Sequence, residues 1–314
     1  MRAVKPLLAL AGLVLLGYML SKLSLARLAG DLARVGPWAL VTPLLAGGWL
    51  YGNAMALYVF LPSAVSKWGL WRNRFVSEGY NNILPLLGLG GEGFKVQHLA
   101  RVIALDDAVT ATLKERLVDS VLGLWQPAAC VAIGAWLLPL PRAAHDAVIA
   151  SAVGSFALGC VAVAAIFTPW PYRLAARAAR LVERNAASED GASAQTRERP
   201  QLGVRRTIIA IAWMLAGRVL GVGEIALIMW RLGQTPSLHA LVEWIFLYGA
   251  FGVVGTIAWP VPGNIGVNEA AAVLLFQWLG LPPDDGMALA LVRRARLLFV
   301  SSCGVALFAA ERRR

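Results

Sequence analysis

The chain has few charged residues for its length. Of its 314 residues, 15% are charged and 58% are hydrophobic. Because a soluble domain has about a quarter of its residues charged, this composition excludes an ordinary water-soluble enzyme. Mean hydropathy is +0.64, and the charges are gathered between apolar runs. The sequence therefore predicts an all-α, polytopic integral membrane protein.

Cysteine and histidine are also scarce, with three of each. The cysteines lie in apolar surroundings without a C-x-x-C spacing, so we interpret them as packing residues rather than as a disulfide framework. The histidines show no metal-ligand spacing. We therefore expect no metal site and no cofactor. The residues concerned are Cys130, Cys160, Cys303, His98, His145 and His239.

The common catalytic motifs are missing from the sequence. There is no G-x-S-x-G elbow, no Walker loop and no H-E-x-x-H, so hydrolytic or ATP-driven chemistry has no support. We expect a transporter rather than an enzyme. Two alternatives stay open: a membrane-embedded lipid-modifying transferase, which needs only one or two polar groups, and a non-catalytic scaffold of a lipid-synthesis complex.

Long apolar segments recur through a single transmembrane domain that covers 1–314. Each is about twenty residues long, as a bilayer requires, and three shorter or more polar segments lie between them. The first is expected to be an uncleaved helix, because no small-residue cleavage site follows it. The long segments are 6–21, 38–61, 112–138, 146–169, 207–231, 240–259 and 286–310, and the short ones are 67–84, 93–105 and 265–281.

Basic residues exceed acidic ones, with 29 Lys and Arg against 18 Asp and Glu. Arginines bunched beside membrane segments suit cytoplasmic flanks and anionic headgroups better than nucleic acid. The stretch 173–206 has eight arginines and four acids and is predicted to be a cytoplasmic loop. Basic residues at both ends predict cytoplasmic termini, in the inner membrane of a bacterium.

An internal repeat is the most informative feature. "PLLGLGGEGFK" from Pro85 and "PGNIGVNEAAA" from Pro262 each place a glutamate seven residues after the proline, at Glu92 and Glu269. Downstream, "LDDAVTATLKER" and "PDDGMALALVRR" each contain an Asp-Asp pair and end in an arginine. The same order at offsets of 177 and 178 residues predicts a duplication. Those arginines are Arg116 and Arg294.

The predicted repeats are about 38–138 and 207–310, and they run in opposite directions across the membrane. Each contains a broken-helix, re-entrant hairpin, the first entering from the cytoplasm and the second from outside. Non-helical backbone at membrane depth must be buried in protein or line a cavity, so a polar cavity is expected. The hairpin turns are assigned to Pro85, Gly88, Gly91, Pro262, Gly263 and Gly266.

Glu92 and Glu269 are the first candidates for a functional role. A carboxylate at a helix N-terminus can simply stabilise the helix dipole. However, an ionisable group inside the membrane costs about 2.5–3.5 kcal/mol and usually marks a substrate, ion or proton path. Their paired placement favours the functional interpretation, with proton or cation coupling as its specific form.

Several basic residues are further candidates. Arg116 can pair with Asp119 three residues later on the same helix. Arg294 has no such acid and lies in an arginine cluster, which suits a phosphate or carboxylate. Lys95, His98 and Arg101 are predicted to form a cationic stripe that faces headgroups, solvent or a ligand.

Two charged residues and two acid pairs complete the set. Arg218 and Glu224 lie six residues apart in an apolar segment, so each needs a partner on another helix. The pairs Asp106-Asp107 and Asp284-Asp285 immediately precede predicted helices and are interpreted as N-caps.

Two motif blocks show a family resemblance. "NNILPLLGLGGEGFK" followed by "ATLKERLVDSVLGL", and "PVPGNIGVNEAA" followed by "ALALVRR", resemble the flippase-like transmembrane region associated with lysylphosphatidylglycerol synthases. The "GGEGFK" variant is most similar to the branch linked to hopanoid biosynthesis. The resemblance covers roughly 6–310. It implies roles for Asn82, Pro85, Glu92, Glu115, Arg116, Asp119, Pro262, Gly263, Gly266, Glu269 and Arg294.

The resemblance implies that a lipid or lipid-linked molecule is moved between leaflets: a phospholipid, an aminoacyl-lipid or a hopanoid. The expected partners are membrane lipids with anionic or zwitterionic headgroups, and lipid-biosynthesis enzymes. Aminoacyl transfer in bifunctional members is attributed to a soluble domain that this chain lacks, so we do not expect the synthase activity. Asn264 replaces a commoner glycine, and no basic residue lies between Pro85 and Glu92. Headgroup specificity is therefore expected to differ from that of aminoacyl-phospholipid flippases.

Overall fold

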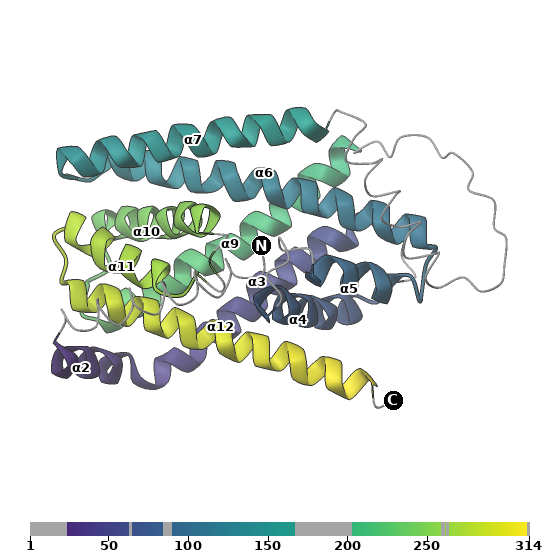
Figure 1. Cartoon of the computed structure of the whole chain (residues 1–314), viewed down its shortest axis with the longest axis horizontal. Coiled ribbons are helices and arrows are strands. Elements are labelled where there is room, and N and C mark those ends of the chain that lie inside the picture. The colour runs from purple at the N-terminus through teal and green to yellow at the C-terminus, as the bar shows by residue number, and fades with distance from the viewer. Residues whose placement is uncertain are drawn as a thin grey trace.

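The computed structural model describes residues 24–62, 65–83, 90–166, 203–258, 261 and 264–312. Within these ranges the regular structure is helical (Figure 1). The predicted first segment 6–21 and most of the basic loop 173–206 lie outside the described residues. The helices are α2 (Leu25–Val35), the 3-10 helix η1 (Gly36–Leu40), α3 (Val41–Tyr58), α4 (Lys67–Ile83), α5 (Gly90–Leu99), α6 (Leu105–Leu137), α7 (Arg142–Ile166), α9 (Val204–Arg231), α10 (Leu238–Ile257), α11 (Val267–Trp278) and α12 (Pro283–Arg312).

Four of the described helices are long and apolar enough to cross a membrane, namely α6, α7, α9 and α10. Large apolar side chains also lie on the outer surface, for example Trp136 at 88% exposed and Val219 at 67%. Such a surface is stable against lipid tails rather than water. The chain is therefore a multi-pass α-helical membrane protein. Helices α3 and α12 occupy the predicted segments 38–61 and 286–310, but neither is among these four.

Two groups of four helices follow the same order. We call α3 to α6 the first half and α9 to α12 the second half. Helices α5 and α11 begin at Gly90 and Val267, and α6 and α12 begin at Leu105 and Pro283. These starts are separated by the same 177 and 178 residues as the sequence motifs. The helix boundaries thus follow the motif offsets, while the repeat boundaries at 38–138 and 207–310 stay predictions.

The packing between the halves is reciprocal. Helix α3 packs on α9, α4 packs on α12, and α10 packs on α6. In Figure 1, α6 and α12 run in opposite directions, with α4 and α5 near one end of the bundle and α10 and α11 near the other. This is the arrangement that an inverted duplication produces. The depth to which the hairpins enter the membrane stays a prediction.

Glycines allow the halves to approach closely. A Cβ atom on Gly52 of α3 would lie 2.7 Å from the carbonyl oxygen of Trp213 on α9. A Cβ atom on Gly304 of α12 would overlap the carbonyl oxygen of Phe75 on α4. Small residues at such crossings bring the backbones of membrane helices together. Gly52 and Gly304 therefore allow two close contacts between the halves.

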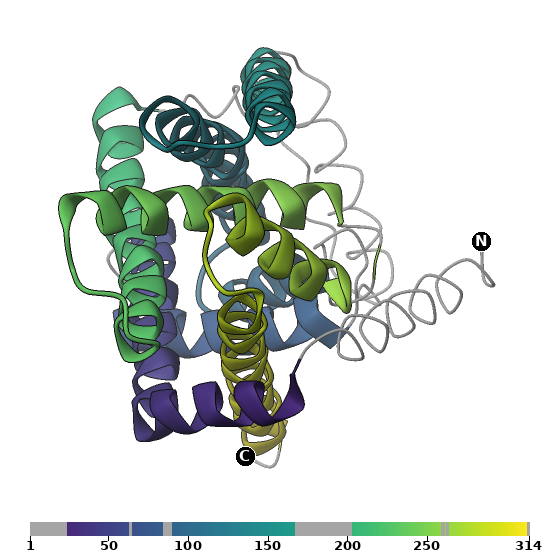
Figure 2. The ribbon, with the colours of Figure 1, turned by 90° about the vertical axis from the view of Figure 1, so that its left-hand side faces the viewer.

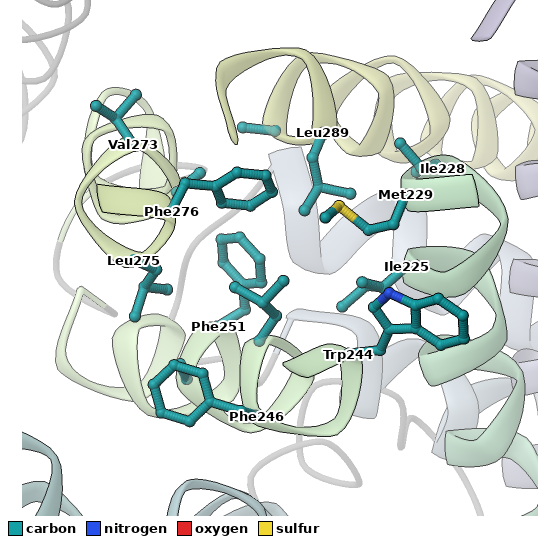
Figure 3. Close-up of a cluster of buried hydrophobic side chains, with 14 of the residues drawn as sticks. Ile225, Ile228, Met229, Trp244, Phe246, Phe251, Val273, Leu275, Phe276 and Leu289 are labelled. Carbon is teal, nitrogen blue, oxygen red and sulfur yellow. The ribbon is translucent and has the colours of Figure 1, made fainter. Parts of the chain in front are cut away.

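A hydrophobic core anchors the second half. It includes Ile225 of α9, Phe246 of α10, Phe276 of α11 and Leu289 of α12, each with no exposed surface (Figure 3). Helix α10 runs across the view in Figure 2, whereas α6, α7 and α12 appear nearly end-on. The core therefore holds the short α11 and the start of α12 against an obliquely placed α10. This packing positions the charged residues that follow on α12.

Candidate functional site

The first half contains a buried, charge-balanced cluster. The side chain of Lys95, 1% exposed, places its Nζ 2.6 Å from Glu92 and 2.8 Å from Glu115. Glu115 has no exposed surface and also accepts a hydrogen bond from Arg74 of α4 at 3.2 Å. Buried charges are tolerated when they are paired. Two carboxylates and two cations meet this requirement here.

A chain of ion pairs leads from this cluster to the second half. Arg116 lies 4.0 Å from Glu92 and 3.5 Å from Asp119. Asp119 also contacts Arg218 of α9 at 3.0 Å. Arg218 in turn donates to the side-chain oxygen of Gln126 at 3.0 Å. The pair between Arg116 and Asp119 is the one expected from their spacing.

Glu269 organises the start of α11. One carboxylate oxygen accepts from the backbone N–H of Gly266 at 2.8 Å. The other accepts from Arg294 of α12, at 3.0 Å from Nε and 2.7 Å from Nη2. Arg294 also donates to the backbone oxygen of Asn264 at 3.3 Å. The carboxylate behind the Pro-Gly turn therefore holds the helix start and a neighbouring helix together.

The repeat-related acids and arginines meet each other in both halves. Glu92 faces Arg116, and Glu269 faces Arg294. Arg294 has no acid nearby on its own helix and finds a carboxylate partner 25 residues away in sequence, on α11. Spacing along one helix cannot detect such a contact between helices.

Glu224 links α9 to two further arginines of α12. It lies 3.7 Å from Arg293 and 3.0 Å from Arg296. The guanidinium of Arg293 also lies 4.6 Å from the ring centre of Phe251, a cation–π contact. Glu224 and Arg218 therefore both find partners on other helices, as their separation of six residues requires.

Two neighbouring cavities adjoin these charges. The larger has a volume of about 300 Å³ and the smaller about 170 Å³. Both are lined by Tyr248, Arg293, Arg296 and Leu297. The larger is lined also by Gln126, Arg218, Asn264, Asn268, Glu269 and Arg294, and the smaller also by Glu78 and Glu224.

Two hairpin glycines have clear structural reasons. A Cβ atom on Gly91 would overlap the backbone oxygen of Ser77 on α4, and its N–H donates to Asn81. Gly266 has a φ of 80°, in the left-handed region that favours glycine. Other predicted positions are not described: Pro85, Gly88, Pro262 and Gly263 lie outside the described residues, as does the side chain of Asn82.

Two expectations were wrong. The cationic stripe does not form, because Lys95 is buried among carboxylates while Arg101 is exposed. The pair Asp106-Asp107 does not cap α6, since Ala104 occupies the cap position and the two acids lie in the first turn. In that turn a carboxylate still interacts favourably with the helix dipole.

Sequence reasoning did not select several residues of the site. Arg74 has no repeat counterpart, because Phe251 stands 177 residues later. Arg293 and Arg296 are the other members of the arginine cluster around Arg294 and were not selected individually. The signal that could have found Arg293 is a charge difference within the repeat, because the corresponding residue 178 positions earlier is Glu115. Tyr248 and Asn268, which line the larger cavity, carried no recognisable signal.

The fold and the buried charges define a class: a multi-pass membrane protein with a polar interior. Among the described residues, no group of three His, Cys, Asp or Glu side chains is placed to hold a metal ion. The chain matches the family described as lysylphosphatidylglycerol synthase TM region over residues 3–304. It therefore belongs to that family, as the motif blocks indicated. No curated protein and no solved structure matches the chain.

Membership places the chain among membrane proteins linked to lipid synthesis or translocation. The resemblance to the hopanoid-associated branch stays a prediction, because the match is to the family as a whole.

Proposed function

We propose that this protein moves a lipid between the leaflets of the membrane, as a flippase-like transporter without catalytic activity. The observation that carries the proposal is the larger cavity, which is lined by four arginines inside a bundle with an apolar outer surface. Such charges are costly in a bilayer and usually mark a substrate path. A lipid headgroup could cross there while its acyl chains stay among the lipid tails.

The opposed halves supply a means of alternating access. In transporters with inverted repeats, the substrate site lies where the repeats meet, next to broken helices. Here the larger cavity is lined by α6 of the first half and by α9, α10, α11 and α12 of the second. The ion-pair chain through Asp119 and Arg218 joins the same halves. A headgroup bound at Arg218 would therefore contact the ion-pair chain that joins the two halves.

The partners and the location belong to the same proposal. Arginines suit the phosphate of an anionic or zwitterionic headgroup, and lipid-biosynthesis enzymes are proposed as partners that supply the lipid. Arg205 and Arg206 are exposed at the start of α9, which favours a cytoplasmic position for that end. We accordingly propose a bacterial inner-membrane protein with both termini in the cytoplasm.

The test is a sidedness assay in proteoliposomes with fluorescent phospholipids. Wild type, Glu92→Gln and Glu269→Gln are compared at matched reconstitution. The control is Asp146→Asn, because the Asp146 side chain is 86% exposed. We expect transbilayer movement in the wild type and the control, and its loss in both glutamate variants. Absence of movement with every lipid and gradient would contradict translocation, and lipid turnover would favour a transferase.

A further inference from the structure

The larger cavity offers hydrogen-bond donors in excess. Arg218, Arg293 and Arg296 line it, and each guanidinium has five N–H groups. Within the described part of the chain, the buried Nε atoms of Arg218 and Arg293 find no hydrogen-bond acceptor, whereas the Nε of Arg296 lies 3.0 Å from a carboxylate oxygen of Glu224. The side chains are 13%, 21% and 18% exposed. Buried arginine donors of this kind call for an acceptor that carries negative charge.

The carboxylates of this region are already engaged. Both oxygens of Glu269 accept hydrogen bonds, one from Gly266 and the other from Arg294. Glu224 lies between Arg293 and Arg296. An ammonium group in the larger cavity would therefore meet arginines before it met an available carboxylate. Like charges in a poorly solvated site repel strongly.

We infer that the larger cavity selects an anionic, phosphate-bearing headgroup that lacks an amine, and disfavours zwitterionic or aminoacylated lipids. This inference rests on the proposed function and narrows its substrate class. The arginines would bind the phosphate oxygens in pairs. The side chains of Asn268 and Tyr248, which line the same cavity, can bond to uncharged hydroxyl groups.

Glu78 provides the competing route for an amine. It comes from α4 and lines the smaller cavity rather than the larger one. A headgroup that placed an ammonium there would depend on Glu78, whereas an anionic headgroup in the larger cavity would not. Glu78→Gln therefore separates the two modes of binding.

The described residues of the first half do not offer an equivalent site. At the position that corresponds to Arg293 it has Glu115, which is fully buried between Lys95 and Arg74. The charges in that cluster are balanced, because two carboxylates pair with two cations. The selective site therefore lies in the second half.

The experiment measures binding to the purified full chain in uncharged detergent, without transport. The probes are short-chain phosphatidylglycerol, phosphatidylethanolamine, lysyl-phosphatidylglycerol and inorganic phosphate, titrated by calorimetry. We expect phosphatidylglycerol to bind at least about tenfold more tightly than either amine-bearing lipid. Weak competition by inorganic phosphate would locate recognition at the phosphate itself. Equal affinity for the three lipids would overturn the inference.

Variants identify the site. Arg293→Gln and Arg296→Gln should each weaken phosphatidylglycerol binding about 10- to 100-fold, whereas Arg293→Lys should retain part of the affinity. Arg142→Gln, at an exposed arginine, and Glu78→Gln should leave it unchanged. A melting temperature close to that of the wild type shows that a variant is folded. Unchanged binding in folded Arg293→Gln and Arg296→Gln would contradict the inference.

The outcome is distinguishable from failure of the proposed function. Lipid movement in proteoliposomes with equal binding of all lipids would leave translocation standing and reject the selectivity. Selective binding without lipid movement would reject translocation and retain the site.

Discussion

The two halves of the protein use repeat-related residues in different ways. In the first half, Glu92 and Glu115 are neutralised by Lys95 and Arg74 in a tightly packed cluster. In the second half, the counterpart of Glu115 is Arg293, and arginines line two cavities. Among the described residues, both halves thus keep a Glu–Arg contact, while the arginine-lined cavities are built around the second half. We interpret the first half as a structural anchor and the second as the lipid site.

The largest effect is expected from breaking the first-half anchor. Glu115→Gln leaves Arg74 and Lys95 buried with one carboxylate fewer, and removing one partner of a buried pair costs about 3–5 kcal/mol. The free energy of unfolding in mild detergent measures this loss. Asp146→Asn, at an exposed site, should change it by less than about 0.5 kcal/mol. A Glu115→Gln variant as stable as the wild type would remove the distinction between the halves.

A comparison of Glu92 with Glu269 sharpens the distinction between the two halves. Glu269→Gln loses the charge on an acceptor of three hydrogen bonds and should destabilise by about 2–3 kcal/mol. Glu92→Gln should cost less, about 1–2 kcal/mol, because Lys95 keeps its contact with Glu115. Chemical denaturation of both variants checks the order. The reverse order would show that the first-half pair is the stronger one.

The contact between the halves is tested at a glycine. Gly304→Ala places a methyl group against the backbone of Phe75 on α4, and overpacking of this kind costs about 1–3 kcal/mol. The matched control is Gly93→Ala on α5, where a Cβ atom would meet nothing within 4 Å. Thermal denaturation of the two variants should separate them. Equal melting temperatures would argue against the close packing of α4 on α12.

The smallest effect concerns the pH dependence of stability, at the start of α12. Burial, and then the neighbouring Asp31, raise the pKa of Asp285 to about 6. The folded state holds this proton more tightly than the unfolded state does. Protonated Asp285 therefore adds to the free energy of unfolding at low pH, and this stabilisation is lost as the pH rises through 6. We expect a loss of about 1 kcal/mol after solvent screening. Asp285→Asn should flatten the pH dependence of stability between pH 4 and 7, and an unchanged slope would contradict this account.

Much of the fold was predictable from local patterns in the sequence. Apolar length located the long helices but not α2, which lies in no predicted segment, and the offset between Pro85 and Pro262 anticipated the matching starts of α5 and α11. The start of α6 was missed by seven residues, because its first turn contains Asp106 and Asp107 and does not look apolar. Polar residues at a helix N-terminus are favourable, so hydropathy underestimates such helices.

The site was less predictable because its contacts join distant segments. Glu269 and Arg294 were each selected, but their pairing depends on how α11 folds against α12. Lys95 was assigned to a cationic stripe with His98 and Arg101, because a single helix does not reveal that α4 and α6 bring Arg74 and Glu115 to its buried face. Arg74 was missed for the same reason. Sequence identified charged groups, and packing decided their partners.

The most direct test of the central claim is the position of a bound lipid. A structure of the protein in nanodiscs of phosphatidylglycerol, determined by cryo-electron microscopy, would show where a headgroup lies. The account predicts phosphate density in the larger cavity, within hydrogen-bonding distance of Arg218, Arg293 or Arg296. Headgroup density beside Lys95 and Glu92 in the first half, with the second-half cavity filled by water alone, would contradict it.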